Sequence, residues 1–189
     1  MRIIAIIGVP ASGKTELVRG MLHLFREGFS HGLLHGHCDR AGQRYLLGIY
    51  RGWDFDGTDQ LSFRAVVDLR AWLPTLPEQA VVIFEGDRFA QLRLLQELLA
   101  IHQLTVVLID ASPETLSRRR DKRAKKTGKP QDKAWLAGRT TKVNRIAGAL
   151  MGHVLRWENN TKDEQARNLA KLCALIGVED ESFATKGGA

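Results

Sequence analysis

The feature that most constrains how this chain folds is the segment Gly8-Val-Pro-Ala-Ser-Gly-Lys-Thr15, which fits the pattern G-x-x-x-x-G-K-T. The apolar run Ile3–Ile7 precedes it, and apolar residues at helical spacing follow it. Between a strand and a helix, such a turn directs backbone N–H groups at phosphate oxygens, and the helix N-terminus adds partial positive charge. The segment in this context therefore predicts a phosphate-binding loop, or P-loop.

The chemistry of this loop predicts ATP and Mg²⁺ as the cofactors. Lys14 can reach the β- and γ-phosphates, and the Thr15 hydroxyl can bind Mg²⁺. Lys14 is also expected to act in catalysis, by stabilising negative charge in the transition state. The residues expected to bind ATP here are Gly8, Pro10, Ala11, Ser12, Gly13, Lys14, Thr15 and Glu16.

Apolar runs alternate with stretches of helical spacing along the rest of the chain. This alternation is typical of an α/β fold with helices on both faces of a sheet. We expect three layers around a five-stranded parallel sheet, in a single domain covering 1–177 and followed by a flexible tail, 178–189. The predicted strands are Ile3–Ile7, Leu33–His37, Ala80–Phe84, Thr105–Ile109 and His153–Trp157.

Glu85 follows the predicted strand Ala80–Phe84 directly. A carboxylate at the carboxyl end of a strand beside the P-loop strand can order Mg²⁺, so Glu85 joins Thr15 as a predicted metal site. Asp87 and Arg88 come next and are expected to extend towards the acceptor.

Asp39 and Arg40 follow the second predicted strand. Since the carboxyl ends of parallel strands meet at one edge, we expect Asp39 to accept the proton of an attacking hydroxyl. Arg40 would contact the acceptor phosphate. Asp87 is the alternative base.

Basic residues are concentrated in one window. The whole chain has a net charge of +7, and residues 118–133 contain nine basic and two acidic side chains. We predict an arginine-rich lid over about 118–140, with Arg118, Arg119 and Arg123 closing on the phosphates and Arg119 acting in catalysis. The surplus charge favours a second polyanion such as DNA, although a solvated basic helix is the alternative.

Two helix starts have recognisable caps: Ser112-Pro113, and Thr161 with Glu164 three residues later. Asn159 and Asn160 lie just before the second, where their amides are expected to contact adenine.

Composition limits the environment of the chain. Its apolar runs fall short of the roughly 20 residues of a membrane span, and its two cysteines have no metal-like spacing. We expect a cytoplasmic protein without a membrane partner.

Together, the P-loop, the strand-ending acids, the arginine lid and the Asn159-Asn160 turn resemble the nucleoside and nucleotide kinase branch of P-loop proteins. The resemblance implies the P-loop NTPase fold and places the acceptor pocket between the second and third strands.

A narrower resemblance rests on Leu47-Gly-x-Tyr50 and Gly57-Thr-Asp-x-Leu-Ser62. These motifs are similar to bacteriophage P-loop kinases that phosphorylate 5-hydroxymethyluracil in DNA. This chain departs from them at Gln60, where an arginine is common. The location implied would be the cytoplasm of an infected host cell.

By that resemblance, Gly57, Thr58, Asp59 and Ser62 would help form the acceptor site. From their positions in the sequence, we expect Asp39, Arg40, Tyr50 and Arg88 to bind the acceptor as well. Tyr50, Trp53 and Phe55 could stack on a flipped or unpaired base. Gly57-Thr-Asp59 equally suits a turn that caps the following helix.

Three functions therefore remain open. The first is an ATP-dependent kinase acting on 5-hydroxymethyluracil in DNA. The second is a kinase of free nucleotides, nucleosides or another small molecule. The third is a P-loop NTPase without a phosphate acceptor.

Overall fold

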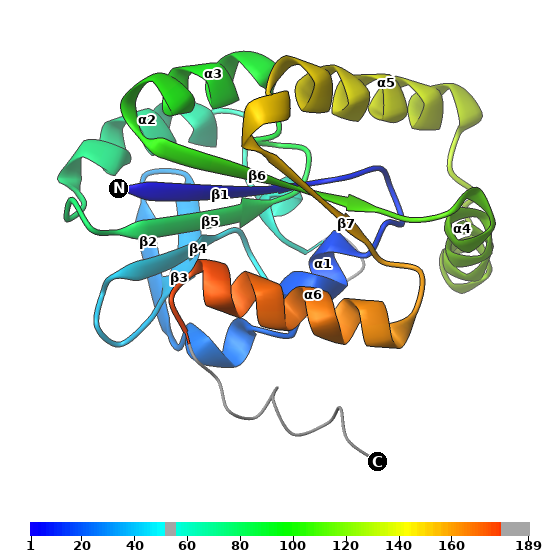
Figure 1. Ribbon diagram of the computed structural model, residues 1–189, viewed down its shortest axis with the longest axis horizontal. Helices are drawn as coiled ribbons and strands as arrows, with labels where there is room; N and C mark the ends of the chain where they lie inside the picture. Colours follow the sequence, from blue (N-terminus) through cyan, green and yellow to red (C-terminus); the bar gives the residue numbers. More distant parts are fainter. Residues whose placement is uncertain (52–55, 179–189) are drawn as a thin grey trace.

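The computed structural model describes residues 1–51 and 56–178. Within them, a seven-stranded sheet runs in the order β2-β3-β4-β5-β1-β6-β7 (Figure 1). The α/β fold is thus confirmed, and the predicted number of five strands is wrong. The strands are β1 (Arg2–Ile7), β2 (Glu27–His31), β3 (Leu34–Cys38), β4 (Arg44–Leu47), β5 (Val81–Glu85), β6 (Gln103–Asp110) and β7 (Val154–Glu158).

The two strands missed from the sequence are β2 and β4. β2 is short and mostly exposed, and β4 has only four residues, so neither gives the apolar run of a buried strand. Both pair antiparallel with β3, whereas β4, β5, β1, β6 and β7 run parallel to one another. The second predicted strand therefore exists as β3, but it runs in the opposite direction to β1.

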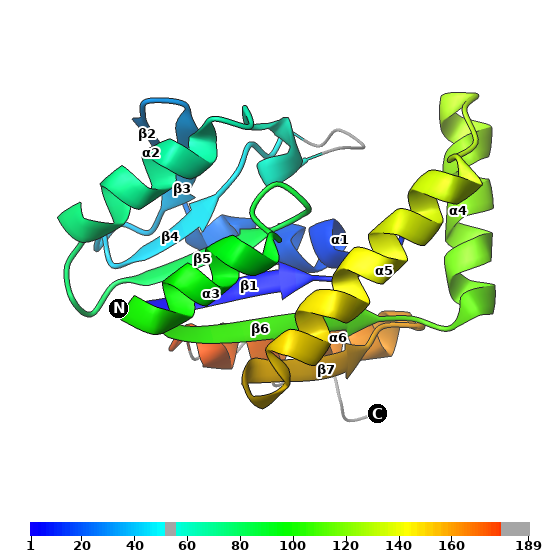
Figure 2. The same cartoon turned by 90° about the horizontal axis from the view of Figure 1, so that it is seen from above.

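Helices cover both faces of the sheet, giving three layers (Figures 1 and 2). Helices α2, α3 and α5 pack on Ile3 and Ile7, whereas α1 and α6 pack on Ile4 and Ile6. Alternation of side chains along a strand gives β1 these two buried faces. The helices are α1 (Lys14–Arg19), α2 (Ala65–Trp72), α3 (Leu92–Ile101), α4 (Pro113–Thr127), α5 (Lys133–Ala149) and α6 (Lys162–Leu175), with 3₁₀ turns at Leu22–Leu24, Thr58–Gln60, Leu73–Thr75 and Met151–His153.

Both predicted caps are present. The Ser112 hydroxyl accepts a hydrogen bond from the Thr115 N–H at the start of α4. Thr161 and Glu164 form a reciprocal capping box at the start of α6. These bonds satisfy amides that the helix itself leaves unpaired.

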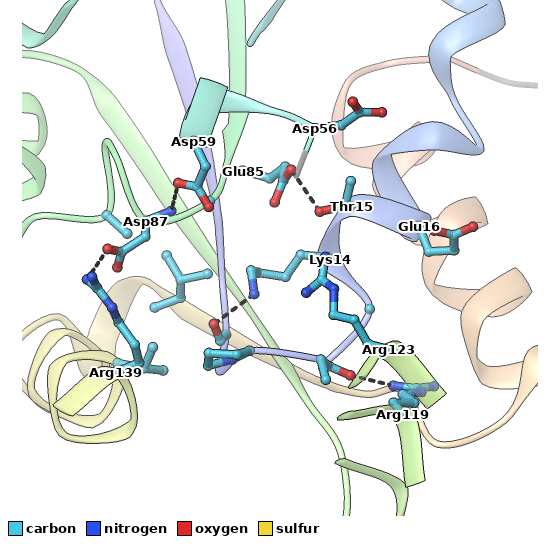
Figure 3. A pocket seen from close by; sticks show the side chains of 18 of the residues that line it. Lys14, Thr15, Glu16, Asp56, Asp59, Glu85, Asp87, Arg119, Arg123 and Arg139 are labelled. Atoms are coloured by element: carbon cyan, nitrogen blue, oxygen red, sulfur yellow. Dashed lines mark hydrogen bonds and ion pairs between the residues drawn. The ribbon is translucent and has the colours of Figure 1, made fainter. Parts of the chain in front are cut away.

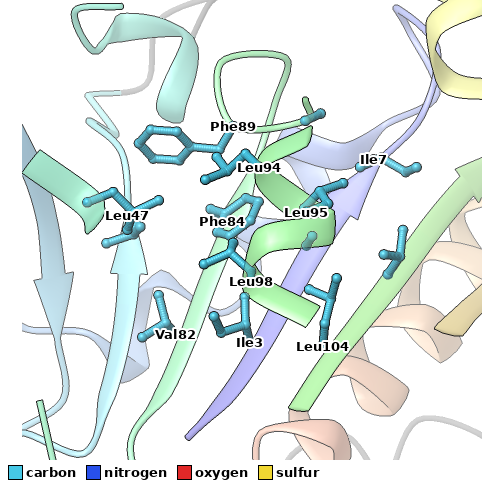
Figure 4. Packing of buried hydrophobic residues seen from close by; sticks show 14 of the residues in the cluster. Ile3, Ile7, Leu47, Val82, Phe84, Phe89, Leu94, Leu95, Leu98 and Leu104 are labelled. Atoms are coloured by element: carbon cyan, nitrogen blue, oxygen red, sulfur yellow. The ribbon is translucent and has the colours of Figure 1, made fainter. Parts of the chain in front are cut away.

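The core also fixes the loop that follows β5. Phe84 at the end of β5 and Phe89 beyond the loop are both buried and pack edge-to-face, with ring centroids 5.5 Å apart (Figure 4). Such pairs anchor backbone as well as burying apolar area. The loop at 86–88 is thereby held beside the P-loop.

The tail predicted for 178–189 lies outside the described residues except for Val178. In the part of the chain that is described, no helix has the length and apolar character needed to cross a membrane.

Candidate functional site

The P-loop lies between β1 and α1, near the centre of the sheet. A Cβ atom at Gly8 would lie 2.4 Å from the Ile109 carbonyl oxygen, and one at Gly13 would lie 2.3 Å from Asn159 Nδ2. Both glycines are therefore required by close packing against the neighbouring strand and turn. Ala11 adopts a positive φ of 74°, which tightens the turn further.

Lys14 folds back over this loop. Its Nζ donates hydrogen bonds to the carbonyl oxygens of Gly8, at 2.8 Å, and Val9, at 3.1 Å (Figure 3). Burial lowers the pKa of Lys14, although the nearby carboxylates, led by Glu85, oppose that effect. The ammonium group is thus held against the carbonyl oxygens at the start of the loop.

Glu85 ends β5 and points at the first turn of α1. Its Oε1 accepts a hydrogen bond of 3.1 Å from the Thr15 hydroxyl. The side chain is almost wholly buried, and that burial raises its pKa to about 7; Lys14 lowers the pKa in opposition and Asp59 raises it further. Thr15 and Glu85, the predicted metal ligands, therefore lie together.

Residues 56–59 cross directly above Glu85. A Cβ atom at Gly57 would lie 2.1 Å from Glu85 Oε1, so only glycine permits this approach. The Thr58 hydroxyl donates to the Glu85 carbonyl oxygen at 2.6 Å. The predicted acceptor motif is thus packed against the predicted metal ligand.

Asp59 links this segment to the loop after β5. Its Oδ1 accepts hydrogen bonds from the backbone N–H groups of Asp87, at 2.8 Å, and Arg88, at 3.1 Å. Arg88 also donates to the Asp59 carbonyl oxygen and lies over the exposed ring of Phe63. Ser62 is exposed and accepts a bond from the Arg64 N–H, beyond this cluster.

Asp87 is bound by two cations from α5. Arg139 forms an ion pair with its carboxylate (Figure 3), and Lys142 Nζ lies 2.7 Å from its Oδ1. Lys142 also donates to the Asp87 carbonyl oxygen at 3.1 Å. These contacts tie α5 to the loop after β5.

The outer side of the P-loop is held by α4 and by the turn before α6. Arg119 donates to the carbonyl oxygens of Ser12, at 3.0 Å, and Asn159, at 2.7 Å. Asn159 Nδ2 donates to the Ser12 carbonyl oxygen at 2.8 Å. Asn160 accepts from the Ser112 N–H, so it joins two turns.

These groups border one cavity of about 520 Å³. Its carboxylates come from α1, from the 56–59 segment and from residues 85–87, and its cations come largely from the two helices after β6. The acids are Glu16, Asp56, Asp59, Glu85 and Asp87, and the cations of α4 and α5 are Arg119, Lys122, Arg123, Lys126, Arg139 and Lys142. The predicted lid thus consists of two helices facing the P-loop, with Arg118 exposed on α4 and absent from the lining.

The predicted position of Asp39 is wrong. Because β3 runs antiparallel to β4, and β4 parallel to β5, Asp39 lies at the sheet edge opposite the P-loop. There it forms an ion pair of 2.8 Å with Arg44 and accepts the N–H groups of Gln43 and Arg44. Burial opposes its ionisation, but these bonds outweigh that effect and lower its pKa. The exposed Arg40 lies on the same turn, so neither residue reaches the cavity.

Tyr50 is placed differently from the prediction as well. It packs against the apolar cluster beneath α1 and α6, and its hydroxyl is 3.4 Å from the Leu47 carbonyl oxygen. Burial raises its pKa well above the usual value. Trp53 and Phe55, predicted to stack on a base, lie outside the described residues.

Among the charged residues that line the cavity, Arg19, Asp56 and Lys142 lie outside every predicted site, and Arg139 had been predicted only as part of the lid region. Asp56 is buried and pairs with Arg19 at 2.8 Å. A signal did exist on α5, because Arg139 and Lys142 are three residues apart and share a helix face. No comparable signal marks Asp56, which depends on the fold to reach α1.

The fold and this cavity define a P-loop protein of the nucleotide kinase type. A family described as P-loop Nucleotide Kinase3 matches residues 1–162, and the chain belongs to that family. No curated protein matches the sequence.

Solved structures are similar at low identity. The sulfotransferase domain of the olefin synthase from Synechococcus PCC 7002 is 16% identical with a TM-score of 0.50, over 100% of this chain and 78% of that one. A sugar kinase from Janibacter sp. HTCC2649 is 15% identical with a TM-score of 0.49, over 95% and 99%. A chain of the Pnkp1/Rnl/Hen1 RNA repair complex is 16% identical with a TM-score of 0.45. That alignment covers 79% of this chain and 46% of the other. The similarity to the sulfotransferase domain supports the fold alone. The other two structures have TM-scores below 0.5 and support no conclusion about this chain.

Proposed function

We propose that this protein is an ATP-dependent phosphotransferase. The observation that carries the proposal is the single cavity in which the P-loop faces an acidic wall made by Asp59, Glu85 and Asp87. A P-loop binds the donor phosphates, and the opposite wall is placed to receive a hydroxyl or phosphate acceptor.

Mg²⁺ fits the residues at the junction of the two walls. The Thr15 hydroxyl and the Glu85 carboxylate are hard oxygen donors, which Mg²⁺ prefers. Burial disfavours the charged form of Glu85, and a bound cation would offset that cost. When bound, the ion would neutralise charge on the β- and γ-phosphates.

Asp59 is the base that the geometry favours. Its Oδ1 is occupied by two backbone N–H groups, whereas its Oδ2 makes no hydrogen bond to any described residue. Both carboxylate oxygens of Asp87 already have cationic partners, Oδ1 in Lys142 and Oδ2 in Arg139, so neither is open to an attacking hydroxyl. Asp59 would therefore accept the proton of the attacking hydroxyl, with Asp87 fixing α5 over the site and Arg88 positioning Asp59.

Charge that develops during transfer would be stabilised by Lys14 and by Arg123, which lines the same cavity. The hydrogen bonds that Arg119 makes to described residues end on the backbone carbonyl oxygens of Ala11, Ser12 and Asn159, so its proposed role is to hold the P-loop and Asn159 in place.

For the acceptor, we propose the hydroxymethyl group of 5-hydroxymethyluracil in DNA. The Gly57-Thr58-Asp59 motif that suggested this acceptor lies against Glu85, at the acidic wall. A second candidate is a free nucleotide, because six cations of α4 and α5 line the cavity itself, where they could grip a small phosphorylated acceptor.

The deciding experiment is transfer from γ-labelled ATP, run in parallel on oligonucleotides with 5-hydroxymethyluracil, on the same oligonucleotides with thymine, and on free nucleotides. Label on the first substrate alone supports the DNA kinase. Label on free nucleotides alone supports the second candidate. Steady ATP hydrolysis without any labelled acceptor would contradict both.

A further inference from the structure

A second hollow of about 580 Å³ lies between α3 and α5, helices that run beside each other on the same face of the sheet (Figure 2). We call it the α3–α5 groove. Lys142 and Ile146 line both this groove and the P-loop cavity. The groove and the P-loop cavity are therefore neighbours, with the side chains of Lys142 and Ile146 at the boundary between them.

The walls of the groove are basic and contain no acidic residue among the described residues that line it. Arg93 stands on α3 and Arg145 on α5, and both are exposed. Arg93 pairs with Glu97 through a single exposed contact of 3.1 Å, which is weak and readily exchanged. Arg145 forms no hydrogen bond or ion pair with any residue in 1–51 or 56–178.

Neutral hydrogen-bonding groups lie between these cations: Gln96 on α3, Thr141 on α5, and Gln91 at the N-cap of α3, whose amide also donates to the Arg88 carbonyl oxygen at 2.7 Å. Such side chains can donate to phosphate or sugar oxygens without adding charge. Cations with neutral hydrogen-bond donors between them suit a nucleic-acid backbone, in which single negative charges are regularly spaced. They suit a single highly charged group, such as a triphosphate, less well.

Gly138 leaves room in the groove wall. Glycine inside a helix reduces helix stability relative to alanine, so it usually has a packing reason. A Cβ atom at Gly138 would meet no atom within 4 Å, so packing within the described chain does not require glycine there. The open space faces the groove that Gly138 lines.

We infer that the α3–α5 groove binds the sugar–phosphate backbone of a DNA strand and leads its target nucleotide past Lys142 into the cavity. This inference rests on the proposed function, because it takes the acceptor to be part of a polymer. A free nucleotide would be held within the cavity and would not extend into the groove. The groove would add affinity mainly through its cations, so binding would weaken with salt.

The test uses the whole protein and a fluorescently labelled single-stranded oligonucleotide containing one 5-hydroxymethyluracil. Arg145→Glu and Gly138→Glu place negative charge in the groove. Gly148→Glu adds the same charge to the same helix outside the groove, again where a Cβ atom meets nothing. Arg167→Glu reverses a charge on α6, on the opposite face of the sheet.

Fluorescence anisotropy should show at least tenfold weaker oligonucleotide binding for Arg145→Glu and Gly138→Glu, and unchanged binding for the two controls. Arg145→Ala should reduce the slope of log affinity against log salt by about 0.7, the value for one lost single-strand phosphate contact. The KM for phosphoryl transfer to the oligonucleotide should rise in parallel, while transfer to free 5-hydroxymethyl-2′-deoxyuridine stays unchanged.

Two results of the binding experiment would overturn the inference. One is a wild-type protein that does not bind the oligonucleotide. The other is equal binding by Arg145→Glu, Gly138→Glu and the controls. If binding is lost as expected but no acceptor is ever phosphorylated, the groove inference survives and the proposed kinase activity fails. If transfer to the oligonucleotide persists at unchanged KM in Arg145→Glu, the kinase proposal survives and the groove inference fails.

Discussion

The cavity has two sides that are built in different ways. The P-loop side takes its backbone from one continuous segment, 8–15, between β1 and α1. The acidic side combines residues 56–59 with 85–87, and it is closed by Arg139 and Lys142, more than 50 positions further on. A continuous segment can be identified as a motif, whereas side chains joined across the chain depend on the whole fold.

The two sides meet at Glu85, which contacts Thr15 on the P-loop side and lies against Gly57 on the acidic side. A single residue thus couples the proposed metal site to the proposed acceptor site. Substitutions on the P-loop side, on the acidic side and at Glu85 can therefore test whether the two sides have separate roles in catalysis.

The largest effect is expected on the P-loop side, from Lys14→Ala. Removal of the ammonium group should lower kcat by about 10³-fold or more, because Lys14 is the cation proposed to stabilise the charge that develops on the transferred phosphoryl group. The measurement is single-turnover transfer from labelled ATP, with thermal unfolding recorded to verify that the variant folds. Arg167→Ala on α6 is the matched control and should transfer normally. Transfer within tenfold of wild type would remove Lys14 from the proposed mechanism.

On the acidic side, Asp59→Asn should lower kcat by about 10²-fold while leaving ATP affinity within a few-fold. The amide can still accept the two backbone hydrogen bonds, so the loss would report the missing base. Asp39→Asn should have no effect on kcat, because Asp39 lies at the opposite edge of the sheet. Asp87→Asn should raise KM more than it lowers kcat, since it loosens α5. A kcat loss larger in Asp87→Asn than in Asp59→Asn would reassign the base to Asp87.

The difference between the two sides also explains what could be predicted from the sequence. The β1–P-loop–α1 unit follows from local pattern, as do the caps at Ser112 and Thr161, because their partners lie within a few residues. Asp39 was misplaced because strand direction is invisible in an apolar run. β3 became antiparallel through two short strands, β2 and β4, that lack a clear apolar pattern.

The acidic side was predicted in part. Asp59, Glu85 and Asp87 line the cavity, and Gly57 and Thr58 pack against Glu85, whereas the roles expected of these residues stay predictions. The ion pairs of Asp87 with α5, and of Asp56 with Arg19, form between residues far apart in sequence. No local rule brings such pairs together, so they could only be found from the folded chain.

At the junction, stability should depend on pH through Glu85. Burial raises its pKa from 4.5 to about 7, so between these values the folded protein keeps a proton that the unfolded chain releases. Stability therefore falls as pH rises from about 4.5 to about 7, by at most about 3 kcal/mol. In a chelator, the Tm of wild type should drop between pH 5 and pH 8 by more than that of Glu85→Gln.

Mg²⁺ should then restore stability more at pH 8 than at pH 5, because a bound cation favours the ionised carboxylate. In Glu85→Gln this pH-dependent gain should be absent. Equal pH dependence in wild type and Glu85→Gln would show that the carboxylate titrates normally and that the two sides are not coupled through it.

The smallest effect isolates the contact between the two sides. Gly57→Ala places a Cβ atom 2.1 Å from Glu85 Oε1 at a φ of +95°, whereas Gly42→Ala shares a positive φ, +61°, but meets only the Tyr45 hydroxyl at 3.8 Å. Backbone strain is common to both variants, so the difference reports the clash. Urea unfolding should show Gly57→Ala less stable than Gly42→Ala by about 1–2 kcal/mol. Equal losses would mean that residues 56–59 can move away from Glu85 freely, and the acidic side would then be a loosely attached segment whose position over the P-loop does not depend on glycine.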